Sequence, residues 1–205
     1  MHDAAAPADR ELLAAIGVDP ADGELRVACA RIARRLRGER ARVIGFVPSD
    51  DSVAVPPLLV HLGLALCELT GSTVAVVDAN VRYPALAHVT GGTRRHDDSV
   101  FATRWLGGSL ALLSPPRVER AGEVVPQLAR ALIAGAELFA HVLVDLTGFE
   151  LLGEHASAAT CMDAVALVAR AHRTRERELV ELARLMPGDR RGAPKGQFLG
   201  VLLVG

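Results

Sequence analysis

The fold is decided by residues 43–78, which read VIGFVPSDDSVAVPPLLVHLGLALCELTGSTVAVVD. Residues 43–47 form a short apolar run typical of a buried strand, and residues 58–69 form a longer, mostly apolar helical stretch. A second apolar run at 74–77 closes on Asp78. This order of strand, helix and strand predicts two parallel strands joined by a crossover helix.

The same alternation continues to the end of the chain. We predict further strands and helices as follows: strands at 110–113, 142–144, 165–168 and 199–204, and helices at 28–36, 124–136, 151–160 and 174–186. The strands are apolar without alternation, which is typical of strands buried on both faces. The expected fold is therefore α/β, with a parallel sheet of about six to seven strands and helices on both faces. The Gly-, Arg- and Asp-rich stretch 91–108 is predicted to be a mobile loop.

Composition excludes several classes of protein. The chain has 205 residues, of which 50% are hydrophobic, so it can bury a sizeable core. Its formal net charge of −1 argues against a nucleic-acid-binding protein, and its one long apolar run is broken by prolines, which argues against membrane insertion. The spacing of the 3 cysteines and 7 histidines gives no metal site and no disulfide framework. We expect a cytoplasmic protein with a flexible segment at 1–20 and a single domain at 21–205.

The loop after the first predicted strand, residues 48–56, is where a ligand is expected, because open α/β sheets bind ligands at the carboxyl ends of their strands. A phosphate-binding loop needs glycines that turn backbone N–H groups toward the phosphates, a lysine, and a hydroxyl for magnesium. This loop has no glycine and no lysine, it has a proline at the start of the helix, and it carries Asp50 and Asp51. Taken alone, the loop argues against phosphate binding.

Several segments nevertheless occur in a familiar order. Residues 42–47 and the apolar helix are followed by 74–84, VAVVDANVRYP, then by 141–145, HVLVD, and by 168–174, VARAHRT. In this order they resemble the bacterial tyrosine kinases of capsule and exopolysaccharide synthesis, which are relatives of the MinD and ParA ATPases. The resemblance covers roughly residues 20–205. It implies a P-loop NTPase-like fold, with HVLVD as the Walker B strand.

Position by position, the resemblance implies that the nucleotide chemistry is degenerate. The family's phosphate-binding lysine falls on Val55 and its magnesium-binding hydroxyl on Pro56, while Ser52 and Ala54 replace loop glycines. Each lost charge-assisted contact to phosphate is worth about 1.5–3 kcal/mol. We therefore expect a vestigial Walker A region, no catalytic residue, and no bound cofactor or metal. Weak binding of ATP or ADP with magnesium stays open.

The resemblance also marks a vestigial Walker A′ and B region, formed by Asp78, Asn80, Arg82 and Asp145. Asn80 stands where the family has a second acid. Asp78 and Asp145 have two interpretations: each caps the turn after its strand, or the two coordinate residual magnesium. Arg82 either pairs with one of these acids or belongs to a subunit interface. The only lysine, Lys195, lies in a turn before the last strand and is expected to be solvated.

Two other family features are altered. Arg31 and Arg34 match the two arginines of a Glu-x-x-Arg-x-x-Arg motif through which family members form rings, but the glutamate falls on Ala28. They are our candidate interface residues. The family's C-terminal cluster of phosphorylated tyrosines is missing, since Tyr83 is the only tyrosine.

These observations favour a non-catalytic, pseudokinase-like protein over an enzyme. Its expected role is that of a regulatory or scaffolding partner in exopolysaccharide or capsule synthesis and export. The implied partner is a membrane chain-length or polysaccharide export protein, an active family relative, or a second copy of the chain, and such a partner would recruit it to the inner membrane. One alternative is an ATP-binding tyrosine kinase or ATPase of the same family with an atypical loop. The other is a MinD/ParA-like positioning factor, which the near-zero net charge disfavours.

Overall fold

The structure is a computed structural model in which the described residues are 7–39, 41–80, 84–91, 102–114, 129–130, 132–133, 137–149, 155–186 and 197–205. Arg82, Tyr83 and Lys195 lie outside these residues, as does most of the helix predicted at 124–136.

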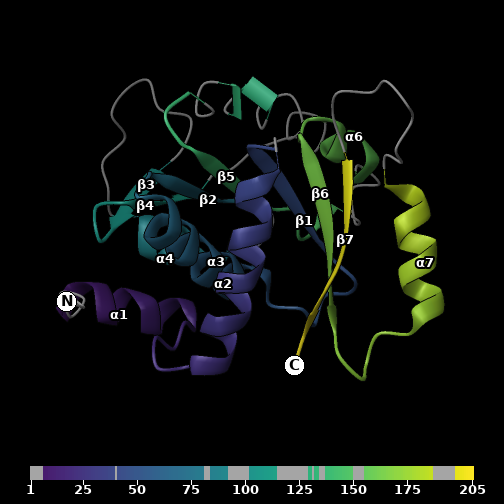
Figure 1. Ribbon diagram of the computed structural model, residues 1–205, viewed down its shortest axis with the longest axis horizontal. Helices are drawn as coiled ribbons and strands as arrows, with labels where there is room; N and C mark the ends of the chain where they lie inside the picture. The colour runs from purple at the N-terminus through teal and green to yellow at the C-terminus, as the bar shows by residue number, and fades with distance from the viewer. Residues whose placement is uncertain are drawn as a thin grey trace.

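A seven-stranded sheet with the order β3-β4-β2-β5-β1-β6-β7 forms the centre of the described structure (Figure 1). Its strands are β1 (Val43–Pro48), β2 (Val74–Asp78), β3 (Ala102–Leu106), β4 (Leu110–Ser114), β5 (His141–Asp145), β6 (Ala164–Arg170) and β7 (Gln197–Val204). All neighbours pair in parallel except β3, which is antiparallel to β4. The predicted α/β class and the mainly parallel sheet are thus confirmed.

Helices cover both faces of the sheet, and the inner strands are therefore buried on both faces. They are α1 (Pro7–Ile16), α2 (Gly23–Gly38), α3 (Val55–Thr70), α4 (Ala87–Thr90), α6 (His155–Thr160) and α7 (Glu176–Leu185). Along β1, Ile44 and Phe46 enter the core beneath α2 and α3, whereas Val43 and Val47 enter the core on the opposite face. Figure 1 shows α2 in front of the central strands and α7 beside the β6–β7 edge.

The crossover helix α3 is held close to the sheet. It is apolar on most of its surface, and the backbone of Gly63 approaches β4 so closely that an added Cβ would lie 2.7 Å from Leu110 Cδ1. Gly71 ends the helix in the left-handed conformation, with φ of 67°, and its N–H donates to the carbonyl of Cys67. This is the usual way for glycine to terminate a helix.

Two expectations from the sequence are contradicted over the described part of each segment. The segment expected to be flexible, 1–20, contains helix α1, whose Leu12, Leu13 and Ile16 are buried in the same core as α2 and α3. The segment expected to be a loop, 91–108, contains β3, which turns back into β4 at two glycines with positive φ. β3 is an edge strand with partly exposed side chains, so it lacks the continuous apolar run of the other strands.

Candidate functional site

The loop at 49–54 lies at the carboxyl ends of the central strands, where a ligand was expected. It leaves β1 at Ser49, whose backbone N–H donates to the carbonyl of Val168 in β6 at 2.7 Å. The Ser49 hydroxyl also lies 3.0 Å from the Thr174 hydroxyl, just beyond β6. Backbone and side-chain hydrogen bonds therefore hold the loop to the carboxyl end of β6 and the turn that follows it.

The carboxylate of Asp50 accepts hydrogen bonds from the polar groups at the start of this loop. Its Oδ1 accepts the backbone N–H of Ser52 at 2.9 Å and also the Ser52 hydroxyl, and its Oδ2 accepts the Ser49 hydroxyl at 2.9 Å. The hydrogen bond from the Ser52 hydroxyl is the main cause of a pKa of Asp50 below its ordinary value. The loop thus holds a stable anion of its own, which would repel a phosphate group.

The start of α3 offers few donors to an anion. Its N-cap, Ala54, makes no side-chain cap, and Pro56 and Pro57 in the first turn have no N–H. Helix N-termini bind phosphate through these N–H groups. Val55 is fully buried in the core, so the position aligned with the family lysine faces the protein interior.

Two of the acids singled out in the sequence lie side by side at the ends of β2 and β5, where Asp78 and Asp145 are register partners. Both side chains are almost completely buried. Asp78 accepts the backbone N–H groups of Asn80 at 3.0 Å and Leu86 at 2.8 Å, and Asp145 accepts both the N–H and the hydroxyl of Thr147, at 2.9 and 2.5 Å. These contacts support the capping interpretation.

Burial dominates the electrostatics of Asp78. It raises the pKa of Asp78 to about 6, and the backbone hydrogen bonds from Leu86, Asn80 and Ala85 offset the rise only in part. The Asn80 side chain lies close to the loop that follows β5. A Cβ added at Gly148 of that loop would be 3.1 Å from the Oδ1 of Asn80. Among the described residues, no cluster of three His, Cys, Asp or Glu side chains is placed to hold a metal ion.

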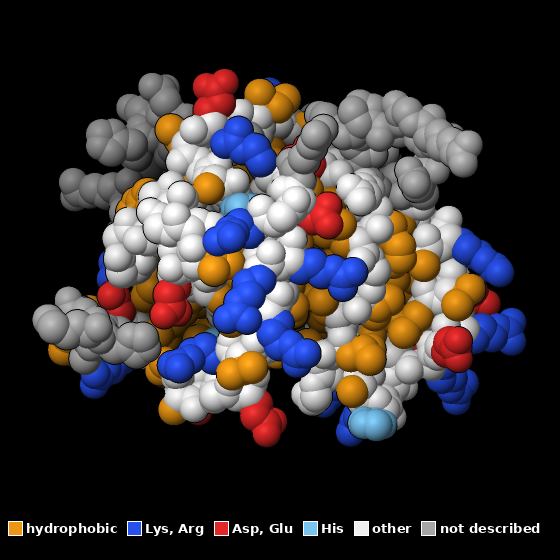
Figure 2. All heavy atoms as spheres, in the orientation of Figure 1, with side chains coloured by type: hydrophobic (Ala, Val, Ile, Leu, Met, Phe, Trp, Pro, Cys, Tyr) orange, Lys and Arg blue, Asp and Glu red, His pale blue; other side chains and the backbone are white. Residues whose placement is uncertain are grey.

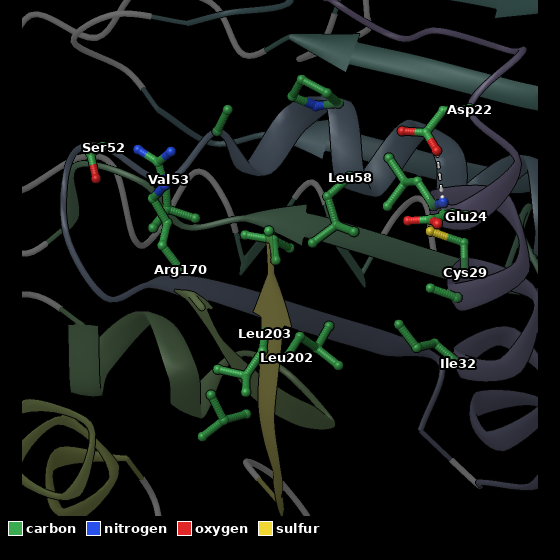
Figure 3. A pocket seen from close by; sticks show the side chains of 17 residues that line it. Asp22, Glu24, Cys29, Ile32, Ser52, Val53, Leu58, Arg170, Leu202 and Leu203 are labelled. Atoms are coloured by element: carbon green, nitrogen blue, oxygen red, sulfur yellow. Dashed lines mark hydrogen bonds between the residues drawn. The ribbon is translucent and has the colours of Figure 1, made fainter. Parts of the chain in front are cut away.

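A cavity of about 840 Å³ opens between α2, the start of α3 and β7 (Figure 3). Asp22 and Glu24 lie toward one end and Arg170 toward the other, with apolar side chains such as Leu58 between them. Burial, together with the charge of Asp22, raises the pKa of the lining Cys29 thiol to about 11, so this thiol is a poor nucleophile. Sequence reasoning did not find this cavity, because it joins three segments that are distant in the chain.

The exposed face of α2 carries a stripe of arginines, visible in Figure 2 as blue side chains along the centre of the molecule. The stripe consists of exposed residues, namely Arg26, Arg31, Arg34, Arg35 and Arg37. None of them forms an ion pair with another described residue. The two candidate interface residues, Arg31 and Arg34, therefore belong to a larger cationic surface.

None of the helices in the described ranges is both long and apolar enough to cross a membrane. No protein-family model matches the chain, and no curated protein matches it.

The fold is nevertheless shared with solved structures. The kinase domain of the Escherichia coli tyrosine kinase ETK is 14% identical, with a TM-score of 0.64, over 86% of this chain and 75% of that one. The VpsO kinase domain is 17% identical, with a TM-score of 0.63, over 97% and 98%. Cobyrinic acid a,c-diamide synthase from Mycobacterium smegmatis, solved with an ATP analogue and magnesium, is 19% identical, with a TM-score of 0.54, over 79% and 74%. The chain therefore has the fold of bacterial tyrosine kinase domains and of ParA-like P-loop ATPases.

Proposed function

We propose that this protein is a non-catalytic module with a P-loop fold, which regulates or scaffolds exopolysaccharide or capsule synthesis and export. The observation that carries the proposal is the loop at 49–54. Its own Asp50 carboxylate accepts the donors of Ser49 and Ser52, and two prolines replace N–H groups at the start of α3. The negative charge of such a loop repels nucleotide phosphates, and the loop offers them few N–H donors for hydrogen bonds.

The proposed mode of action is docking. The partner is a membrane chain-length or polysaccharide export protein, or an active relative, and it brings this cytoplasmic protein to the inner membrane. Arg31 and Arg34, exposed on α2 without described ion pairs, are proposed to lie in the interface with that partner or with a second copy of the chain. Guanidinium groups suit such contacts because they bind carboxylates in a fixed, forked geometry.

A second candidate function is that of an ATP-binding kinase or ATPase with an atypical loop. It is favoured by the adjacent acids Asp78 and Asp145, which occupy the ends of neighbouring strands. The two functions differ in whether the protein binds nucleotide.

Calorimetric titration with ATP and ADP, each with magnesium, separates the two. We expect no saturable heat up to millimolar nucleotide. Saturable binding at micromolar concentration would overturn the non-catalytic role and support the kinase or ATPase.

A restored loop provides the complementary test. A variant with glycines at Ser52 and Ala54, together with Val55→Lys and Pro56→Ser, should gain measurable nucleotide affinity. Because Val55 faces the core in the present loop, the two glycines are included to let the loop turn and bring residue 55 out toward a phosphate. The single Asp51→Gly variant, changed at an exposed loop position, serves as the control. If the variant folds and still does not bind nucleotide, this loop does not correspond to the phosphate-binding loop of the kinases.

A further inference from the structure

Strand β7 leaves one edge of the sheet without a neighbour among the described strands. It pairs with β6 on one side and stands last in the strand order. The carbonyl of Val204 accepts the N–H of Ala171 at 2.7 Å, so the backbone of Val204 points toward β6. Because backbone groups alternate along a strand, the N–H and C=O groups of Val201 and Leu203 point away from β6, toward the unpaired side.

The part of this edge that can pair regularly is residues 200–204. The register toward β6 shifts between Phe198, the partner of Val165, and Gly200, the partner of Ala166. Such a bulge disturbs pairing in the first half of the strand. From Gly200 to Val204 the register is continuous, and this segment has no charged side chain and no proline, which usually protect an exposed edge. A short segment centred on Leu202 is therefore open to another strand.

The outward-pointing residues also expose apolar side chains, on the face of the sheet that carries α7. Val201 is the register partner of Leu167, whose side chain lies in the core on that face, and residues two apart in a strand share a face. The side chains of Val201 and Leu203 are 39% and 66% exposed. Figure 2 shows hydrophobic side chains gathered on this part of the surface, between α2 and α7.

Helix α7 has unused apolar surface beside this edge. None of its residues is fully buried, and Leu182 and Ala183 are only partly buried against the core. At 100° per residue, the exposed Val180 and Leu185 lie on opposite flanks of that apolar stripe, so one of them borders the β7 side. The edge strand and the helix together present one apolar strip.

Charge favours a second copy of the chain at this strip and disfavours one at α2. Residues 175–184 contain three arginines and three glutamates, so two α7 helices can meet without net repulsion. Residues 23–38, which form α2, contain five arginines and one glutamate, so two such helices would repel each other.

The geometry of the edge also fits a second copy, related by a twofold axis at Leu202. Antiparallel pairing about this axis places Val201 opposite Leu203 of the other copy, and each such pair exchanges two backbone hydrogen bonds. The exposed apolar side chains of both copies then lie side by side on one face. With strands about 4.8 Å apart, the two α7 helices on that face would be about 10–15 Å apart, which leaves room for these side chains between them.

We propose that the protein forms a twofold-symmetric dimer, in which the β7 strands of two copies pair antiparallel about Leu202 and join the two sheets. The two α7 helices lie on one face and enclose Val201 and Leu203 of both copies. The arginines of α2 stay exposed on the opposite face, and the dimer does not depend on the docking role proposed above. Because so short a strand gives a small interface, we expect a reversible dimer with a Kd on the order of 10 µM.

Sedimentation velocity at about 1–100 µM protein brackets the expected Kd. The wild type should change from monomer to dimer across this range. Leu203→Lys places two ammonium groups in the apolar strip and should weaken the dimer about tenfold or more. Leu138→Lys is the matched control: Leu138 is 71% exposed and lies beside the start of β2, away from β7, so this variant should dimerise like the wild type.

Cysteine variants test the alignment of the two strands. At the axis, Leu202 faces its own copy as a non-hydrogen-bonded pair with Cα atoms about 4.5 Å apart, within disulfide range. The two copies of Leu203 would be about 8 Å apart, beyond that range. Under mild oxidation, Leu202→Cys should form a covalent dimer on a non-reducing gel. Leu203→Cys, at the more exposed position, and the wild type with its three free cysteines should stay mostly monomeric.

The proposal is wrong if the protein is monomeric throughout this range, if Leu203→Lys leaves the dimer intact, or if Leu203→Cys cross-links as readily as Leu202→Cys. A monomeric protein that binds a fluorescein-labelled peptide of alternating valine and threonine, and loses this binding in Leu203→Lys, would make a segment of another protein the occupant instead. The nucleotide titration is independent: nucleotide binding would remove the non-catalytic role, whereas failure of the sedimentation and cross-linking tests would remove only the dimer.

Discussion

Replacement of Asp78 by Asn tests the electrostatics at the end of β2. The Asp78 carboxyl is fully buried, and burial raises its pKa from 3.8 to about 6. An acid whose pKa is raised by folding contributes stability that is fully present below its unfolded pKa and is lost as the pH rises through the folded pKa. A shift of about two units corresponds to about 3 kcal/mol in all, of which about 2 kcal/mol is lost between about pH 4.5 and about pH 7.

Asparagine cannot ionise, so the Asp78→Asn variant escapes this loss. It gives up one of two acceptors for buried N–H groups, at a cost of about 1–3 kcal/mol that does not depend on pH. The free energy of unfolding of the variant minus that of the wild type should therefore rise by about 2 kcal/mol from about pH 4.5 to about pH 7. Burial also lowers the pKa of His61 and His141, but both proteins contain these residues and their effects cancel in the difference.

The measurement is urea unfolding followed by circular dichroism at both pH values. The Asp51→Asn variant, which removes an exposed carboxyl, controls for surface charge. A difference between the Asp78→Asn and wild-type proteins that stays constant with pH would refute the conclusion that a buried carboxyl ionises at this site.

Three further substitutions test the packing by urea unfolding. Leu13→Ala should cost about 2–4 kcal/mol, because this α1 side chain is only 3% exposed; a loss below about 0.5 kcal/mol would show that α1 is not part of the core. Gly63→Ala should cost about 1–3 kcal/mol, since its Cβ would lie 2.7 Å from Leu110 Cδ1, whereas Gly38→Ala meets nothing within 4 Å and should be nearly neutral; equal effects would contradict the close approach of α3. Asp163→Ala should cost about 1–3 kcal/mol because its carboxylate accepts two backbone N–H groups at 2.9 Å at the start of β1, and an unchanged stability would exclude that tie.

The sequence predicted the strands well because burial on both faces leaves a continuous apolar run. The run at 43–47 became β1, and the run at 74–77 became β2, each within one residue of its bounds. The same criterion missed β3, whose Arg104 and Trp105 are exposed at the sheet edge. It also missed α1, a short amphipathic helix whose stability comes from tertiary packing rather than from its own propensity.

Prediction of the candidate site was partial for a different reason. The loop sequence shows directly that glycine and lysine are absent and that two prolines follow Val55. The hydrogen bonds that Asp50 accepts from its neighbours and the burial of Val55 depend on the three-dimensional arrangement of the loop, which cannot be read from the sequence. The cavity between α2 and β7 is still harder to foresee, because these two elements are separated by more than half of the chain.

The position of β1 between β5 and β6, in the interior of the sheet, has a consequence for synthesis of the protein. Val43 pairs with Val142, and Ile44 pairs with Ala164, so β1 emerges from the ribosome long before either neighbouring strand exists. At about 5–20 residues per second, the wait for the first neighbouring strand is on the order of 5–20 seconds. During that time an apolar strand and the apolar helix α3 are exposed together. Folding should therefore be slow, limited by contacts of high sequence separation, and the nascent chain should depend on chaperones that bind its first third.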